Sequence, residues 1–138
     1  MIITTAVDLE GVPASPAAFQ AIIPALEGQE DPFAILYENR DSLAFMQTLW
    51  TPSGYLLEHQ EGSLANHFRT VREDLSAEEV ITAFQSFAAG ESAWRTSFEY
   101  RRIEVRSRWY RLGQAIGKAW GDFRAGYAES RAAARRRE

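Results

Sequence analysis

The clearest hydrophobic pattern in the chain covers residues 76–89, where apolar side chains recur at helical spacing, at Val80, Ile81, Phe84, Phe87 and Ala88. Ser76 stands at the start of this run and Glu79 follows three positions later, which is the pattern of a capping box. Gly90 can adopt the left-handed conformation that often ends a helix. The pattern therefore predicts a capped helix over 76–89, whose aromatic face needs a sheet or another helix to cover it.

Segments rich in β-branched or alternating apolar residues predict an antiparallel sheet beside this helix. A short apolar helix is also expected at 16–26, where Pro24 should bend or shorten it. The expected strands lie at 1–9, 33–38, 43–50, 55–61 and 97–105. Loops are expected at 29–32, 62–74 and 90–96, the second of them with room for a short helical turn around 64–71. The expected fold class is α+β, with an antiparallel meander packed against the helix at 76–89.

The segment 51–54 has proline and glycine at positions that favour a tight turn between two strands. If it closes a hairpin, residues whose numbers sum to 105 face each other. One face then carries Ala44, Met46, Thr48, Trp50, Tyr55, Leu57 and His59. The other face carries a polar strip, Gln47, Glu58 and Gln60, together with Phe45, Leu49 and Leu56. This second face is either a partner-binding surface or the solvated side of a one-sided sheet. The candidate partner-binding residues are Gln47, Trp50, Tyr55, Glu58, Gln60 and Glu61.

The last part of the chain predicts one long helix from about 107 to 135, so the expected division is a body at 1–106 and a basic amphipathic helix at 107–138. Thirty helical residues would be about 45 Å long. An apolar stripe gives a second candidate interface, formed by Trp109, Leu112, Ile116, Trp120, Phe123 and Tyr127. Glycines recur beside it at 113, 117 and 121, which favours a closely packed backbone. The stripe packs on the same domain, docks on another chain or forms a homodimer; the sequence leaves these alternatives open.

Charge is distributed unevenly along the 138 residues. Residues 1–100 hold four arginines, no lysine and 15 Asp+Glu, a net charge of −11, whereas residues 101–138 carry +7. An acidic body would repel phosphates, so direct binding of nucleic acid by the body is not expected. The basic tail could bind nucleic acid, an anionic membrane or the acidic body, or it could be a solvated helix face. The N-terminus has no signal-peptide pattern and no apolar run is long enough to span a membrane, so a cytoplasmic location is expected.

Residue types that could carry catalysis are sparse. There is no cysteine, and no nucleophile, phosphate-binding or zinc-binding motif occurs. An enzyme or metal site built from Glu58, His59 and His67 is the remaining catalytic hypothesis, but their spacing matches no pattern of fixed geometry. We therefore expect no catalytic residue, no metal and no cofactor.

Three segments resemble small immunity proteins of bacterial polymorphic-toxin systems, in particular the α+β group often encoded beside deaminase toxins. The segments are FMQTLWTPSGYLLEHQEG, DLSAEEVITAFQSFAAGES and SFEY, within about 42–105. In that group a hairpin with a polar strand leads to a helix that begins with a Ser/Pro-x-Glu-Glu pattern and ends at glycine, followed by an aromatic and acidic strand end. Here Phe98-Glu99-Tyr100 stands where a tryptophan is more usual, and the segment 107–138 lies outside the resemblance.

The resemblance implies a cytoplasmic inhibitor that binds a cognate toxin domain and blocks its active site or substrate channel. The charge pattern agrees with this, because an acidic body can dock on a basic toxin surface that normally faces nucleic acid. The alternative is a non-enzymatic adaptor or structural protein that acts through its C-terminal helix, by self-association or by binding a larger assembly.

Overall fold

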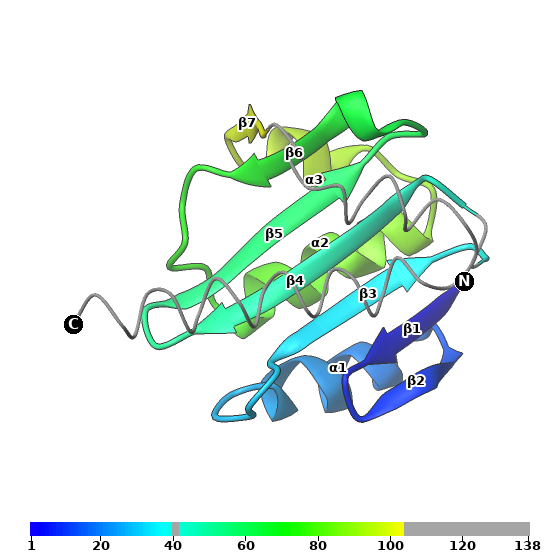
Figure 1. Ribbon diagram of the computed structural model, residues 1–138, viewed down its shortest axis with the longest axis vertical. Helices are drawn as coiled ribbons and strands as arrows, with labels where there is room; N and C mark the ends of the chain where they lie inside the picture. Colours follow the sequence, from blue (N-terminus) through cyan, green and yellow to red (C-terminus); the bar gives the residue numbers. More distant parts are fainter. Residues whose placement is uncertain (40–41, 104–138) are drawn as a thin grey trace. The chain divides into compact units, whose positions relative to one another are not determined.

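The computed structural model describes residues 1–39 and 42–103, which form an α+β unit around one antiparallel sheet of seven strands (Figure 1). The helix predicted at about 107–135 and the domain boundary at 106/107 lie outside the described residues. In chain order the elements are β1 (Ile2–Thr5), β2 (Asp8–Pro13), α1 (Pro16–Ala25), β3 (Phe33–Tyr37), β4 (Phe45–Thr51), β5 (Gly54–Gln60), η1 (Leu64–Asn66), β6 (His67–Thr70), α2 (Ala77–Ala88), α3 (Ala93–Thr96) and β7 (Tyr100–Arg102).

The strands lie in the order β2-β1-β3-β4-β5-β6-β7, and every neighbouring pair is antiparallel. The strands β3, β4 and β5 form the predicted meander, and β6, which was not predicted, extends it by one strand. The first hairpin joins it through β1, and β7 returns beside β6 after α2 and α3. The sheet edges in the described residues are therefore β2 and β7.

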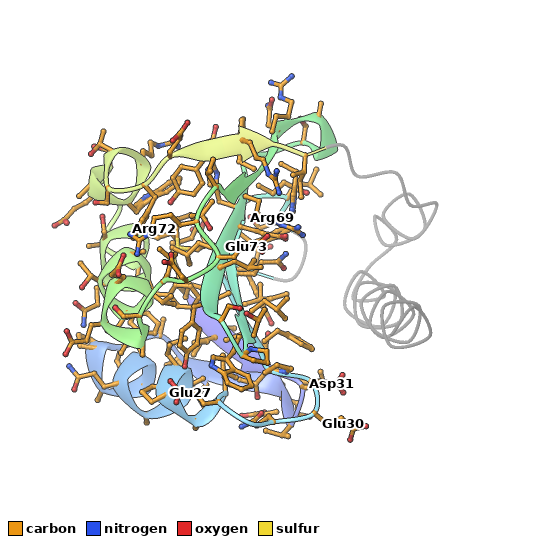
Figure 2. All side chains as sticks on the ribbon, turned by 90° about the vertical axis from the view of Figure 1, so that its left-hand side faces the viewer. Glu27, Glu30, Asp31, Arg69, Arg72 and Glu73 are labelled. Carbon is orange, nitrogen blue, oxygen red and sulfur yellow. The ribbon has the colours of Figure 1, made fainter. Side chains whose placement is uncertain are left out.

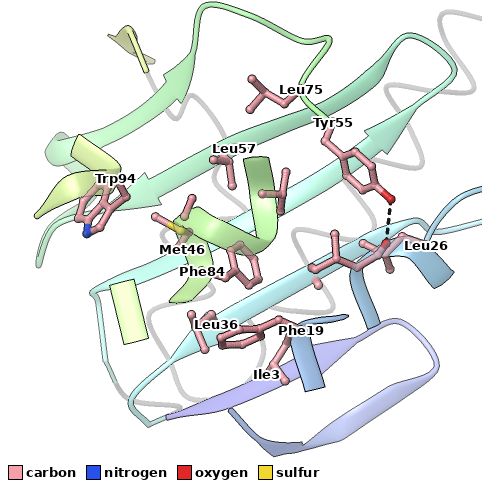
Figure 3. Packing of buried hydrophobic residues seen from close by; sticks show 14 residues of the cluster. Ile3, Phe19, Leu26, Leu36, Met46, Tyr55, Leu57, Leu75, Phe84 and Trp94 are labelled. Atoms are coloured by element: carbon pink, nitrogen blue, oxygen red, sulfur yellow. Dashed lines mark hydrogen bonds between the residues drawn. The ribbon is translucent and has the colours of Figure 1, made fainter. Parts of the chain in front are cut away.

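The three α-helices lie on one face of the sheet, which Figure 2 shows nearly edge-on. We call this the helix face, and the opposite side, on which no described helix lies, the helix-free face. The core between sheet and helices is shown in Figure 3. Phe19 of α1 meets Phe84 of α2 edge to face at 5.6 Å between ring centroids. Tyr55 of β5 crosses the core and donates its hydroxyl proton to the Ile23 carbonyl oxygen at 2.8 Å.

The hairpin of β4 and β5 has the register that the turn predicts. Trp50 pairs with Tyr55 and Gln47 with Glu58, so facing residue numbers sum to 105. Since side chains alternate along a strand, this register places Met46 and Leu57 in the core and Gln47 and Glu58 on the helix-free face. The predicted division of the hairpin into two faces is confirmed.

The N-terminus of α2 has the predicted capping box. The Glu79 N–H donates to Ser76 Oγ at 3.1 Å, and the Ser76 N–H donates to Glu79 Oε1 at 3.4 Å. Leu75 and Val80, on either side of the cap, are both buried. The cap fixes where the helix begins, and Gly90, with φ of 73°, follows its last turn.

Three expectations for individual elements differ from the structure. The strand expected at 1–9 is a hairpin of β1 and β2, whose pairing shifts register between Ile3 and Thr5; Gly11 of β2 has φ of 83°, and its N–H donates to Asp8 Oδ1. The segment 62–74, expected to be a loop with a short helical turn around 64–71, contains η1 within that range but also the strand β6, and the loop expected at 90–96 contains α3. These elements have three or four residues, which is too short for hydrophobic periodicity to mark them.

Candidate functional site

Polar side chains from three neighbouring strands meet on the helix-free face. Gln47 lies on β4, Glu58 and Gln60 on β5, and His67 and Arg69 on β6. Glu58 pairs with Gln47 on one side and with Arg69 on the other, and Gln60 pairs with His67. The register therefore aligns these five residues, which we call the Glu58 cluster.

The carboxylate of Glu58 is the centre of the cluster. Its Oε1 accepts from Arg69 Nε at 2.6 Å and lies 2.5 Å from Arg69 Nη2. Its Oε2 accepts from Gln47 Nε2 and lies 3.1 Å from His67 Nε2. The Glu58 residue is only 3% exposed. Both oxygens are thus satisfied by protein donors in a place that excludes water.

His67 links the carboxylate to Gln60. The Gln60 amide donates from Nε2 to the Leu43 carbonyl oxygen at 2.9 Å, which leaves its Oε1 turned toward His67 Nδ1 at 3.3 Å. Both ring nitrogens of His67 therefore face oxygen atoms. The His67 ring thus bridges two residues of β5.

The surroundings of Glu58 favour its ionised form. Burial alone raises the pKa of this carboxyl group, but the hydrogen bond from His67 and the positive charge of Arg69 outweigh it, and the pKa lies below its ordinary value of 4.5. A carboxylate that is ionised and already bonded to three side chains has little capacity to act as a general base. Because its hydrogen bonds join residues that face each other across β4, β5 and β6, the cluster fixes the register of these three strands.

A second feature is the end of the sheet where β3 begins and the β4–β5 turn lies. The register brings the β1–β2 turn, the end of α1 and the start of β3 to this end. The segment from β6 to α2 lies there too, because Tyr55 and Leu75 exchange backbone hydrogen bonds. We call the carboxylates that these segments carry the acidic end: Asp8, Glu27, Glu30, Asp31, Glu73, Asp74, Glu78 and Glu79.

The acidic end faces the viewer in Figure 2, where Glu27, Glu30 and Asp31 lie along one border and Arg72 and Glu73 lie above them. Most of its carboxylates are exposed. Among the described residues, Arg72 is the one basic side chain in these segments, and it pairs with Asp74 at 2.9 Å and with Glu79 at 3.1 Å. The acidic end therefore carries a strong negative field.

The structure separates the six predicted partner-binding residues. Gln47, Glu58 and Gln60 meet in the Glu58 cluster and are buried. Tyr55 belongs to the core, where burial and the Glu27 carboxylate raise the pKa of its hydroxyl group. Trp50 packs against the core from the helix face, and Glu61 binds the Arg95 guanidinium near α3. These six residues do not form one continuous exposed surface.

The three residues of the catalytic hypothesis are also divided. Glu58 and His67 are in contact on the helix-free face, whereas His59 lies on the helix face against Phe68, Trp94 and Tyr100. In residues 1–39 and 42–103, no three His, Asp or Glu side chains are placed to hold a metal ion. The second candidate interface, from Trp109 to Tyr127, lies outside the described residues.

Arg69 was not predicted as a site residue, and His67 was grouped with Glu58 only in the catalytic hypothesis. Both fell in the segment 62–74, expected to be a loop with a short helical turn, so their pairing with β5 was not predicted. The acidic end is assembled from segments far apart in the chain. Its signal in the sequence is the net charge of residues 1–100 together with the clustering of acidic residues in the expected loops and at helix ends.

Comparisons of the chain with protein-family models, with curated proteins and with solved structures found no match. None of the helices in the described part of the chain is long and apolar enough to cross a membrane.

Proposed function

We propose that this protein is a cytoplasmic immunity protein, which binds a cognate bacterial toxin domain and neutralises it by blocking its active site. The acidic end is the observation that carries this proposal. A dense, exposed set of carboxylates accelerates association with a basic protein surface and selects against acidic partners. Toxin domains that act on nucleic acid need such a basic surface for their substrate. The local resemblance to immunity proteins names the class of partner.

The acidic end suits the proposed contact better than the polar strip of the hairpin does. The strip is buried and its carboxylate is bonded within the protein, so it has little left to offer a partner. Glu73 and Glu78, in contrast, are exposed on the segment between β6 and α2. We therefore place the proposed toxin-binding surface at the acidic end.

Co-expression with the toxin domain encoded beside its gene tests this function. The proposal requires a stable complex that purifies intact and protects cells from the toxin. Absence of both the complex and the protection would reject it.

Charge reversal tests the location of the surface. The variants Glu73→Lys and Glu78→Lys should each lower the association rate constant several-fold at low salt, because steering depends on the local field, with a smaller effect on dissociation. Stopped-flow mixing with the toxin at two salt concentrations measures this. Glu91→Lys is the matched control, since Glu91 is exposed beyond the opposite end of α2 and the change in net charge is the same. Equal effects of all three variants would remove the acidic end as the interface.

A further inference from the structure

The ring of His59 is enclosed by aromatic side chains on the helix face. It stacks on Phe68 of β6, with 4.9 Å between ring centroids and 18° between planes. Trp94 of α3 and Tyr100 of β7 each meet it edge to face at 4.7 Å. His59 is 5% exposed. This histidine is therefore the point where β5, β6, α3 and β7 come together.

The polar contacts of this ring are incomplete. His59 Nδ1 is buried and has no hydrogen-bond partner among the described residues, and the closest carboxylate oxygen, Glu61 Oε1, lies 3.6 Å away. Glu61 in turn accepts a hydrogen bond from the Arg95 guanidinium of α3, which also lies over the Trp94 ring at 4.5 Å. A neutral imidazole suits this environment, because it brings no charge among the rings.

The charged groups around His59 have opposite effects on the pKa of its ring. The Glu61 carboxylate on the same strand favours a protonated ring, whereas Arg95 on α3 and the more distant His67 on β6 disfavour it. Tyr100 of β7 donates its hydroxyl proton to the Trp94 carbonyl oxygen at 2.9 Å. Burial is the largest influence and lowers the pKa of His59 to about 4. A protonated His59 therefore has one compensating partner, Glu61, which already binds Arg95.

We propose that α3 and β7 form an acid-sensitive latch, which is closed while the His59 ring is neutral and opens when the ring gains a proton and draws Glu61 away from Arg95. Both elements are short, with four residues in α3 and three in β7, and short peripheral elements open at lower free energy than the centre of a sheet. Opening would expose the faces of Trp94 and Phe68. The latch is independent of the acidic end and of the proposed toxin binding.

Amide hydrogen exchange followed by NMR on the full chain tests the latch. The Val71 N–H donates to the Glu99 carbonyl oxygen at 2.9 Å and the Ile103 N–H to that of His67 at 3.0 Å, so both report on β7. Their protection factors, corrected for intrinsic exchange, should fall by at least about tenfold between pH 7 and pH 4.5. The Trp50 N–H, which donates to Pro32 O at 2.9 Å, reports on opening elsewhere in the sheet and should stay more protected than both β7 amides at pH 4.5. Unchanged protection at β7, or β7 amides as protected as Trp50 at pH 4.5, would overturn the proposal.

Two further measurements attribute the response to His59. The ring signals of His59 in the wild-type protein should titrate with a midpoint below about pH 5, and a midpoint near its ordinary value of 6.5 would overturn the proposal. The variant His59→Asn cannot take up the proton, so its β7 protection should show no loss at pH 4.5 relative to pH 7. A loss as large as that of the wild type would also overturn the proposal. Because the titration uses the unaltered chain, the test does not depend on the folding of the variant.

Discussion

At the residue scale, Glu58 shows how a buried charge is tolerated in a sheet. Removing a carboxylate from water is costly, and the cost is offset only when its oxygens are paired and hydrogen-bonded. Arg69 supplies the opposite charge from β6, while Gln47 and His67 fill the remaining positions around the carboxylate. The arrangement is specific to one register, because a slip of one residue would turn Glu58 into the apolar core.

The variant Glu58→Gln should destabilise the fold by about 3 kcal/mol, since Arg69 would lose its counter-charge and His67 its contact with a carboxylate. This expected loss is at the lower end of the range for breaking a buried ion pair, because the Arg69 side chain is 33% exposed and can reach water. Urea unfolding at pH 7 measures the change. Gln47→Leu is the comparison, because it removes one neutral donor and should cost about 1 kcal/mol. Equal losses in the two variants would show that the charge of Glu58 contributes little.

At the element scale, the β4–β5 hairpin and the segment before α2 fit closely at Gly54. This residue has φ of 134°, and a Cβ atom there would lie 2.8 Å from the backbone of Asp74. The adjacent Tyr55 exchanges two backbone hydrogen bonds with Leu75, which precedes the helix cap. The turn therefore positions the start of α2 over the sheet as well as closing the hairpin.

The variant Gly54→Ala should lower the free energy of unfolding by more than Gly62→Ala. Gly62 also has a positive φ, of 77°, but an added Cβ would meet no atom within 4 Å. The Gly62 variant thus measures the backbone cost alone, about 1 kcal/mol, and the Gly54 variant adds the clash with Asp74. Thermal unfolding of both proteins provides the comparison. A smaller loss for Gly54→Ala would mean that the segment at Asp74 shifts without cost.

The elements also show what the sequence could and could not predict. The helix at 76–89 and the hairpin register follow from local signals, a capping box and a short turn, and both are confirmed. The strand β6 has four residues and no alternating pattern, so only its pairing with β5 defines it. Because His67 and Arg69 lie on that strand, two of the five residues of the Glu58 cluster depend on tertiary pairing. The polar strip was predicted from the sequence, whereas Arg69 was not and His67 was grouped with Glu58 only in the catalytic hypothesis.

At the scale of the whole molecule, the carboxylates are of two kinds, the exposed ones of the acidic end and the buried Glu58. Protonating the two kinds changes the stability of the fold in opposite directions. The carboxylates of the acidic end repel one another, and protonating them relieves a repulsion that solvent and salt already weaken. Glu58 is buried and paired, so protonating it removes an attraction that solvent does not weaken. The second effect should dominate, which makes acid destabilising for this chain despite its acidic composition.

The free energy of unfolding should therefore fall in two stages as the pH decreases. The pKa of His59 is lowered from 6.5 to about 4, so its neutral ring contributes stability that is complete above pH 6.5 and is lost progressively down to about pH 4. The pKa of Glu58 lies below its ordinary 4.5, so its contribution is complete above about pH 4.5 and is lost as the pH falls through the folded value. Urea unfolding from pH 8 to pH 3 in constant salt measures both stages. The Glu58→Gln variant should lack the second stage and keep the first, and a wild-type stability that rises below pH 4.5 would show that relief of repulsion at the acidic end outweighs the buried pair.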